Sequence, residues 1–262
     1  GVSIGEMFIA GIIPGIFICI VLMVVEYFIS LKRGYKGDEA ASFKTVSRYF
    51  RESVFALFMP VIILGGIYAG IFTPTESAAV AVVYGLIVGI FIHKELSWKD
   101  VSKLILKSAK STALVMYLMV TAEILSYVLV SEQIPQTIAA SILNISTNAI
   151  VVQLIMVFIL LVVGTFLNNS AAMVLLAPIF YPIIMSLGID PLFFGIIMVI
   201  SLAIGHNTPP VGLCLFIACD IGNLKLESLV KEIVPLVAAL IATVVTLNFF
   251  PDVILFLPRL MR

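Results

Sequence analysis

The chain has 262 residues, of which 62% are hydrophobic and 11% charged, and it combines a mean hydropathy of +1.22 with zero net charge. Soluble domains average about 45–50% apolar and about 25% charged residues, so the composition indicates a polytopic membrane protein and gives no basis for nucleic-acid binding. Three cysteines, Cys19, Cys214 and Cys219, lie in apolar segments without metal-site spacing, and we interpret them as small hydrophobic residues. The chain enters an apolar segment directly after Gly1 without signal-peptide features, so we expect it to start partway through a longer protein.

The first half of the chain contains three apolar segments separated by basic stretches. About 20 apolar residues cross the hydrocarbon core as a helix, and Ile4–Leu31 supplies the first span. Residues 32–52 carry six Lys or Arg against three acids, so the positive-inside rule places them in the cytoplasm. Val54–Phe72 and Ser77–Ile92 follow, joined by the break TPTE, and lysines in 93–110 indicate a return to the cytoplasm. We therefore expect a helical hairpin whose turn lies far from the cytoplasm.

The second half alternates apolar segments with polar breaks. Trp98–Lys110 has lysines opposite its apolar positions, which predicts a helix at the membrane surface in contact with anionic lipid. A polar tip, GTFLNNS, separates two apolar arms that either span twice or form a re-entrant hairpin. The segments expected to enter the membrane are, in order, Ala113–Val130, the arms Ala149–Gly164 and Ala171–Leu187, Leu192–Ile221 and Val234–Phe250.

The stretch GHNTPPVGL breaks one of these segments with two prolines. Within a bilayer, irregular backbone survives only when it is buried in protein or lines a wet cavity. Pro209 and Pro210 lack the N–H groups that would bond the carbonyls of Gly205 and His206, and Gly205 and Gly212 bracket the unwound piece. We expect two half-helices, the first ending in free carbonyls suited to a cation and the second beginning with N–H groups suited to a carboxylate.

The hairpin tip provides a second polar break, in which Gly164 and Thr165 end one arm and Asn169 or Ser170 is a natural N-cap for the next. Face to face, the two breaks would offer oxygen atoms without a formal charge, which suits sodium better than a transition metal. Two polar breaks between short apolar arms favour a transporter binding site over packed helix kinks. The predicted sodium ligands are Gly164, Thr165, Asn168, Gly205, Thr208 and Val211, and the predicted substrate contacts are Asn169, Ser170, Asn207, Pro209, Pro210 and Gly212.

Three motifs, GIFTPTESAAVAVVYGL, GTFLNNSAAMVLLAPIFYPI and GIDPLFFGIIMVISLAIGHNTPPVGLCLF, resemble the large membrane subunit of tripartite ATP-independent periplasmic (TRAP) transporters. The opening VSIGEMFIAGIIPGI resembles the mid-chain segment that follows the first repeat of this family. The resemblance implies an all-α, elevator-type secondary transporter in the bacterial inner membrane, built from inverted repeats that each contain a re-entrant hairpin and a broken helix.

The resemblance also implies a function and partners. A sodium gradient would drive import of an organic acid, of the sialic acid or C4-dicarboxylate type, delivered by a periplasmic binding protein, with a small membrane subunit alongside and no organic cofactor. This chain would hold only the second repeat, so the N-terminal half of the subunit would be missing. The family's remaining sodium site maps onto Gly164, Gly205, Thr208 and Val211, whereas many members carry an acid where this chain has Asn168, which leaves the ion count open. The implied domains are 1–112 for scaffold helices, 113–222 for a transport domain with a hairpin at about 148–187 and a broken helix at about 191–221, and 223–262 for a C-terminal transmembrane helix.

Three ionisable residues have structural and functional interpretations side by side. Glu123 lies in the middle of a span, so it is a functional candidate that could also simply pair with a polar neighbour. His206 lies in the break, where local packing is favoured over proton coupling. Thr75 and Glu76 lie where the second arm of the first hairpin begins, and we expect Glu76 to cap it.

Alternative functions remain open at this point. A single-component dicarboxylate or citrate carrier would need no binding protein. An intramembrane enzyme is disfavoured because the sequence has no HExxH motif and no paired intramembrane carboxylates, and its two histidines, His93 and His206, are far apart in sequence. A channel is disfavoured because conducting pores usually show rings of like groups rather than one compact polar pocket.

Overall fold

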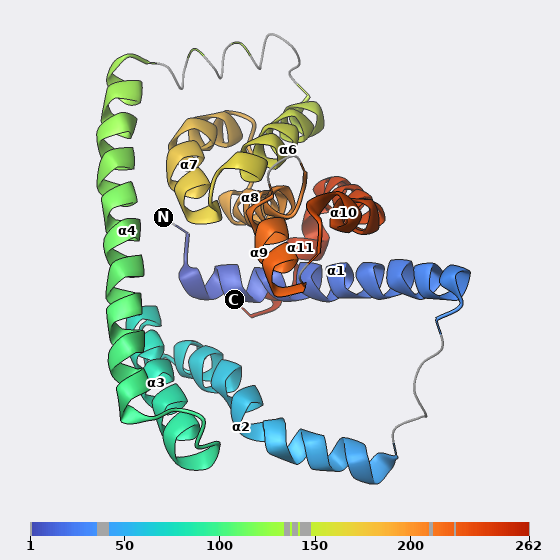
Figure 1. Cartoon of the computed structure of the whole chain (residues 1–262). Helices are drawn as coiled ribbons and strands as arrows, with labels where there is room; N and C mark the ends of the chain where they lie inside the picture. The colour runs from blue at the N-terminus through green and yellow to red at the C-terminus, as the bar shows by residue number, and fades with distance from the viewer. Residues whose placement is uncertain are drawn as a thin grey trace. The chain divides into compact units, whose positions relative to one another are not determined.

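The computed structural model describes residues 2–35, 42–133, 137, 141, 148–209, 212–222 and 224–261, and all the secondary structure among them is helical (Figure 1). This confirms the predicted all-α class. The elements are α1 (Ile4–Arg33), α2 (Phe43–Tyr68), α3 (Pro74–Ile87), the π-helix η1 (Val88–Ile92), α4 (Trp98–Ser131), α6 (Ala149–Phe166), α7 (Asn169–Ser186), α8 (Pro191–His206), α9 (Leu213–Gly222), α10 (Leu226–Phe249) and α11 (Pro251–Leu260).

The helices have the lengths and compositions of membrane spans. Among the described residues, five segments can cross a bilayer by length and hydropathy: α1, α3 continued by η1, α6, α7 and α10. A sixth, α2, bends by 53° between Arg51 and Ser53. The chain is therefore a polytopic membrane protein. Glu123 lies in α4, and its side chain is outside the part of the chain that the structure describes.

The chain forms two compact units, which are described separately. The first contains Gly1–Val2, Ile9–Arg33 and Leu114–Arg262, and the second contains Ser3–Phe8 and Gly34–Ala113. Both α1 and α4 contribute residues to each unit.

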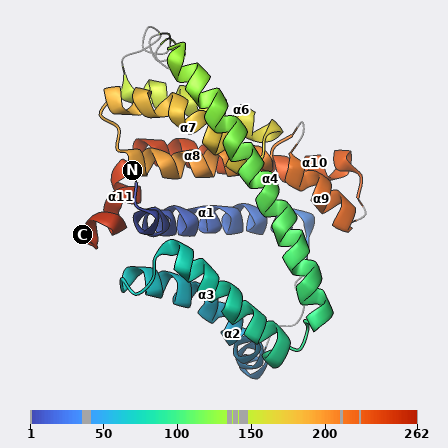
Figure 2. The ribbon, with the colours of Figure 1, turned by 90° about the vertical axis from the view of Figure 1, so that its left-hand side faces the viewer.

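In the second unit, α2 and α3 form the predicted hairpin and lie side by side (Figure 2). The Thr73 Oγ1 accepts a hydrogen bond of 3.3 Å from the Glu76 backbone N–H, while the Glu76 carboxylate accepts one of 2.8 Å from the Thr73 backbone N–H. This reciprocal capping box satisfies two N–H groups that the first turn of α3 leaves without helical partners. The predicted capping role of Glu76 is confirmed, and its partner is the N-cap residue Thr73, the last extended residue before Pro74 opens the helix.

Two boundaries in the second unit were predicted wrongly. Helix α2 begins at Phe43, inside the stretch predicted as a loop, and not at Val54. The surface helix Trp98–Lys110 and the span that follows it are a single continuous helix, α4. No glycine or proline separates the two segments, so the backbone has no reason to break between them. Ser97 directly precedes the helix, and its hydroxyl donates a 2.5 Å hydrogen bond to the Asp100 carboxylate and accepts one of 3.4 Å from the Asp100 backbone N–H.

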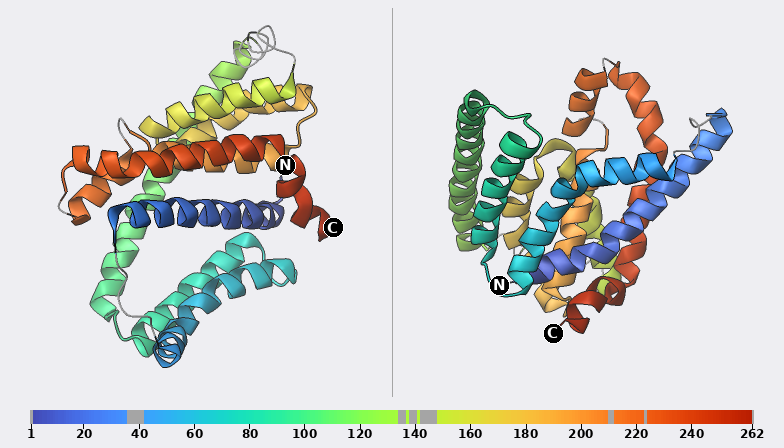
Figure 3. Two further views of the ribbon diagram at one scale, coloured as in Figure 1. Left: turned by 90° about the vertical axis from the view of Figure 1, so that its right-hand side faces the viewer. Right: turned by 90° about the horizontal axis from the view of Figure 1, so that it is seen from below.

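The first unit is built around α8. Asp190 accepts hydrogen bonds from the backbone N–H groups of Leu192 and Phe193 at 2.8 and 3.4 Å, and Pro191 fixes the first helical residue. Helices α6, α7, α10 and α11 all contact α8, and Figure 3 shows α10 running alongside it. Because α8 is apolar on nearly every side and surrounded by other helices, it serves as the core of this unit.

The predicted hairpin and broken helix are confirmed in the first unit. The two arms of the hairpin are α6 and α7, and the broken segment is α8 followed by α9. The observed ends of both arms lie within two residues of the predicted ones. Only Leu167 and Asn168 separate α6 from α7, so the tip of the hairpin is tight.

Candidate functional site

The hairpin tip between α6 and α7 and the break between α8 and α9 meet at two glycines. A Cβ atom built on Gly205 would lie 2.5 Å from the Leu161 carbonyl oxygen and 2.8 Å from the Cα of Gly164. A Cβ atom on Gly164 would lie 2.8 Å from the Leu202 carbonyl oxygen and 3.1 Å from the Cα of Gly205. The backbones of α6 and α8 are therefore in direct contact, an approach that small residues permit between membrane helices.

A backbone hydrogen bond also joins the hairpin tip to the break between α8 and α9. The backbone N–H of Gly212, just before α9, donates a 3.3 Å hydrogen bond to the carbonyl of Thr165 in the last turn of α6. Gly212 has φ +54°, a left-handed conformation that glycine adopts without strain. The proposed meeting of the two tips, which the sequence analysis assumed, is thus present in the structure.

The end of α8 differs from the expectation that the Gly205 carbonyl would be free. That carbonyl accepts a 2.8 Å hydrogen bond from the Thr208 N–H. The regular α-helical donor to it would be residue 209, but Pro209 has no N–H, so the last turn tightens and the N–H of the preceding residue donates instead. The Thr208 hydroxyl donates to the Ile204 carbonyl at 2.7 Å, and the Asn207 side-chain amide donates to Ala203 at 2.9 Å. The predicted freedom of the Gly205 carbonyl is therefore wrong, although one of its two acceptor positions remains for a further donor or a cation.

The polar side chains of the hairpin tip also form hydrogen bonds with residues close in sequence. Asn168, not the predicted Asn169 or Ser170, is the N-cap of α7, since its side-chain oxygen accepts a 3.0 Å hydrogen bond from the Ser170 N–H. The Thr165 hydroxyl donates to the Val162 carbonyl at 2.7 Å, and Thr165 is only 6% exposed. Both hydroxyl and amide oxygens keep lone pairs after these bonds.

Two buried polar atoms beside the breaks have no hydrogen-bond partner among the described residues. They are the side-chain oxygen of Asn169, at the start of α7, and Nδ1 of His206, the last residue of α8. A buried polar atom without a partner is costly, so each of these atoms points to a ligand, ion or water that the site would bind.

The predicted residues divide into three groups. Those in direct backbone contact across the two breaks are Gly164, Thr165, Gly205 and Gly212. Those at the same tips with local hydrogen bonds or unpartnered atoms are Asn168, Asn169, Ser170, Asn207 and Thr208, and Pro209 follows them in the loop. Pro210 and Val211 lie outside the described residues.

Sequence reasoning missed four buried polar residues among those that the structure describes in the helices of the first unit, one of which is Thr243 in α10, 4% exposed. Gln153 in α6, Ser201 in α8 and Asn248 in α10 are 6%, 0% and 2% exposed. A lone polar residue in an apolar helix gives a weak sequence signal, but an asparagine or glutamine near the end of a span is unusual enough to have been singled out.

An all-α polytopic membrane protein in which a hairpin tip meets a broken helix has the architecture of a secondary transporter. Residues 1–253 match the family model described as the DctM component of the tripartite ATP-independent periplasmic transporter. The chain belongs to this family, which confirms the resemblance seen in its motifs.

The relatives that the chain resembles include three TRAP permeases. It is 43% identical, over 97% of its length, to the isethionate TRAP transporter permease protein DctMQ of Oleidesulfovibrio alaskensis. It is 38% identical, over 98% of its length, to the C4-dicarboxylate TRAP transporter large permease protein DctM of Pseudomonas aeruginosa. It is 36% identical, over 98% of its length, to the sialic acid TRAP transporter large permease protein SiaM of Vibrio cholerae. The chain spans 40%, 60% and 60% of the lengths of these three relatives.

Proposed function

We propose that the chain forms the second repeat of a sodium-coupled importer of an organic acid, of the sialic acid or C4-dicarboxylate type, in the bacterial inner membrane. In this proposal a periplasmic binding protein delivers the acid, and a small membrane subunit and the N-terminal half of the same subunit complete the assembly. Residues 113–222 form the moving transport domain of an elevator, 1–112 the scaffold, and 223–262 a C-terminal transmembrane helix.

The observation that carries the proposal is the backbone contact between Gly164 and Gly205. This contact holds two irregular stretches together inside an apolar unit, where unpaired backbone groups are expensive. Such an arrangement is stable when the polar groups serve a ligand, which is the rule for broken helices in transporters.

The oxygen atoms at this contact suit a sodium ion. Carbonyl and hydroxyl oxygens are preferred by hard cations, and the Thr208 hydroxyl already donates its hydrogen to Ile204, so the oxygen can present its lone pairs elsewhere. Gly164, Thr165, Asn168, Gly205, Thr208 and Val211 are the residues proposed to hold the ion.

The helix starts at the same place suit a carboxylate. Both α7 and α9 begin at the breaks, and the first turn of a helix presents N–H groups and the positive end of its dipole to an anion. The residues proposed to contact the substrate are Asn169, Ser170, Asn207, Pro209, Pro210 and Gly212. These groups recognise a carboxylate without reading the rest of the molecule, so the identity of the acid rests with other contacts.

The test is a pair of substitutions at Thr208 in the full-length subunit, assembled with its partner subunit and reconstituted in liposomes. Thr208→Val removes the hydroxyl with little change of shape, and Thr208→Ser restores it. We expect Thr208→Val to raise the sodium concentration for half-maximal uptake by about tenfold, the effect of losing about 1.4 kcal/mol of ion binding, while Thr208→Ser stays near the parent value.

Thr243→Val is the matched control. Thr243 lies in α10, is 4% exposed, and donates its hydroxyl to the Ala239 carbonyl at 2.8 Å, four residues earlier, as Thr208 does to Ile204. Equal losses in Thr208→Val and Thr243→Val would show a structural effect only. Uptake that does not depend on sodium in the parent protein would overturn the coupling, and uptake without a binding protein would favour a single-component carrier.

A further inference from the structure

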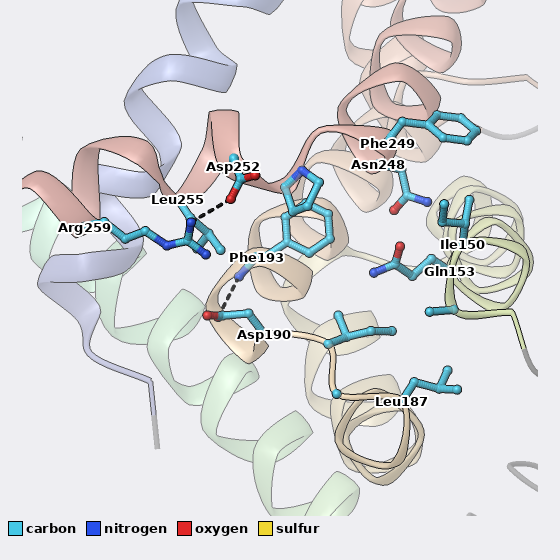
Figure 4. Close-up of a pocket in the computed structure, with 14 residues that line it drawn as sticks. Ile150, Gln153, Leu187, Asp190, Phe193, Asn248, Phe249, Asp252, Leu255 and Arg259 are labelled. Atoms are coloured by element: carbon cyan, nitrogen blue, oxygen red, sulfur yellow. Dashed lines mark hydrogen bonds and ion pairs between the residues drawn. The ribbon is translucent and has the colours of Figure 1, made fainter.

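A polar cavity lies at the opposite end of α8 from the candidate transport site (Figure 4). The helix has 16 residues, so about 24 Å separate its two ends at 1.5 Å per residue. The cavity has a volume of about 400 Å³, within the usual range for small-ligand pockets. It is formed where α6 and α8 begin, where α10 ends and along α11.

The floor of this cavity contains two buried amide side chains. Gln153 is 6% exposed and Asn248 is 2% exposed, and Figure 4 shows both pointing into the space between α6 and α10. Neither the nitrogen nor the oxygen of the Asn248 amide has a hydrogen-bond partner among the described residues. A buried amide left without partners is strongly unfavourable, so Asn248 indicates that the cavity binds a polar group able to donate and accept.

The rim of the cavity carries charges of both signs. Asp190 uses its Oδ1 to cap α8, and its Oδ2 takes no part in those two bonds. Arg259 donates a 2.6 Å hydrogen bond to the Asp252 carboxylate, and both side chains are exposed. Two carboxylates and one guanidinium line the cavity, so a ligand that combines a cationic group with an anionic one finds partners of both signs.

The position of the cavity matches the depth of lipid headgroups. Five of the described helices start or end there, and the ends of apolar helices lie at the boundary between hydrocarbon and water. Ile150 and Phe249 line the cavity and are 39% and 48% exposed. They provide an apolar surface against which the glycerol and upper acyl chains of a lipid can pack, next to the polar floor.

We propose that this cavity binds the headgroup of a phospholipid with a primary ammonium group, of the phosphoethanolamine type. The ammonium donates hydrogen bonds to the Asn248 amide oxygen and the Asp190 carboxylate, and the phosphate accepts a hydrogen bond from the Asn248 amide nitrogen and is paired by Arg259. Phosphocholine has the same net charge but no N–H donor, so it leaves the Asn248 oxygen without a partner.

The test uses the full-length subunit with its partner subunit, purified and returned to lipid nanodiscs that contain phosphatidylethanolamine and phosphatidylcholine in equal amounts. Native mass spectrometry measures the lipids retained, and a thermal melt with each lipid added measures stabilisation. We expect retention of phosphatidylethanolamine over phosphatidylcholine in the parent protein, and an affinity for phosphatidylethanolamine about tenfold weaker in Asn248→Leu, which keeps the branched shape of the side chain but removes the amide.

Ser201→Ala is the matched control, because the Ser201 hydroxyl is also buried without a partner but does not line the cavity. It should retain the lipid as the parent protein does. Equal retention of both lipids by the parent protein, or unchanged retention by Asn248→Leu, would overturn the proposal. Stabilisation by free phosphoethanolamine equal to that by the lipid would assign the cavity to a soluble ligand instead. Because these readouts do not involve sodium or uptake, they stand independently of the proposed transport function.

Discussion

The contact between Gly164 and Gly205 yields the sharpest prediction, which concerns the substitution Gly205→Ala. The added methyl group would lie 2.5 Å from the Leu161 carbonyl oxygen, whereas ordinary contacts begin at 3.4 Å. Helix α6 would therefore have to move by 3.4 − 2.5, or about 0.9 Å. Because the colliding atoms belong to the backbone, no side-chain rotation can relieve the clash.

Two opposing terms set the effect on stability. Alanine is better than glycine in a helix by about 1 kcal/mol, and overpacking a well-packed contact costs about 1–3 kcal/mol. Since the clash involves backbone on both sides, we take the upper end, so the net destabilisation of Gly205→Ala is about 3 − 1, or about 2 kcal/mol. The same displacement would separate the hairpin tip from the break and weaken sodium binding by at least about tenfold.

A graded set of alanine substitutions tests this reasoning. At Gly164 the nearest backbone atom would lie at 2.8 Å, which requires a shift of 3.4 − 2.8, or about 0.6 Å. At Gly15, inside α1, nothing lies within 4 Å of the added methyl group. Thermal unfolding of the full-length subunit in detergent should give a stability order of Gly15→Ala, then Gly164→Ala, then Gly205→Ala, and sodium-dependent uptake should follow the same order. A Gly205→Ala protein as stable and as active as Gly15→Ala would refute the close crossing.

Three further predictions concern helix starts. Asn168→Ala and Asn148→Ala remove equivalent caps, with bonds of 3.0 and 2.9 Å, so each should cost about 1 kcal/mol in thermal unfolding, but only Asn168→Ala should reduce uptake. Thr73→Ala should destabilise α3 by about 1 kcal/mol, measured by hydrogen exchange in its first turn. Hydrogen bonds from the side chain and backbone of Ser97 lower the pKa of Asp100, with a smaller contribution from a nearby lysine, so its stabilisation is present above the unfolded pKa and lost as pH falls through the folded one. Exchange at the start of α4 should therefore differ between the parent and Asp100→Asn at neutral pH and become equal in acid.

The breaks themselves could be predicted from the sequence because their causes are covalent. Pro209 and Pro210 have no N–H to donate, so a helix that reaches Gly205 cannot continue in its regular pattern whatever surrounds it. The polar residues of the hairpin tip likewise separate two apolar arms on composition alone. For this reason the predicted ends of α6, α7 and α8 lie close to the observed ones.

The hydrogen bonds around the breaks could not be predicted in the same way. Whether Asn168 or Asn169 caps α7 depends on which residue is the last with extended backbone. Both are asparagines, so their capping preferences do not distinguish them. The Gly205 carbonyl was expected to be free because Pro209 cannot bond it, yet a small change in backbone dihedrals lets the Thr208 N–H reach it. The sequence alone does not show that the donor to this carbonyl shifts from residue 209 to residue 208.

Contacts between helices were beyond the reach of the sequence for a different reason. An apolar helix in a membrane protein can present several faces to its neighbours, since lipid and protein are nearly equally favourable surroundings. The pattern of apolar residues therefore does not show that Gln153 and Asn248 line one cavity. Only the path of α6 and α10 past α8 brings the two amides together.

The glycine crossing and the proline break depend on each other. Helices in a membrane gain little from hydrophobic burial against one another, so their association relies on close packing and hydrogen bonds. Gly205 is both in direct backbone contact with α6 and the next-to-last residue of α8, so the contact that packs α8 also fixes where the loop begins. The Gly212 N–H then returns to Thr165, one residue from Gly164, which anchors the end of the loop to the same turn of α6. Because one turn of α6 holds both ends of the break, widening that crossing would release the whole polar loop into the apolar interior, where its unpaired groups are most costly.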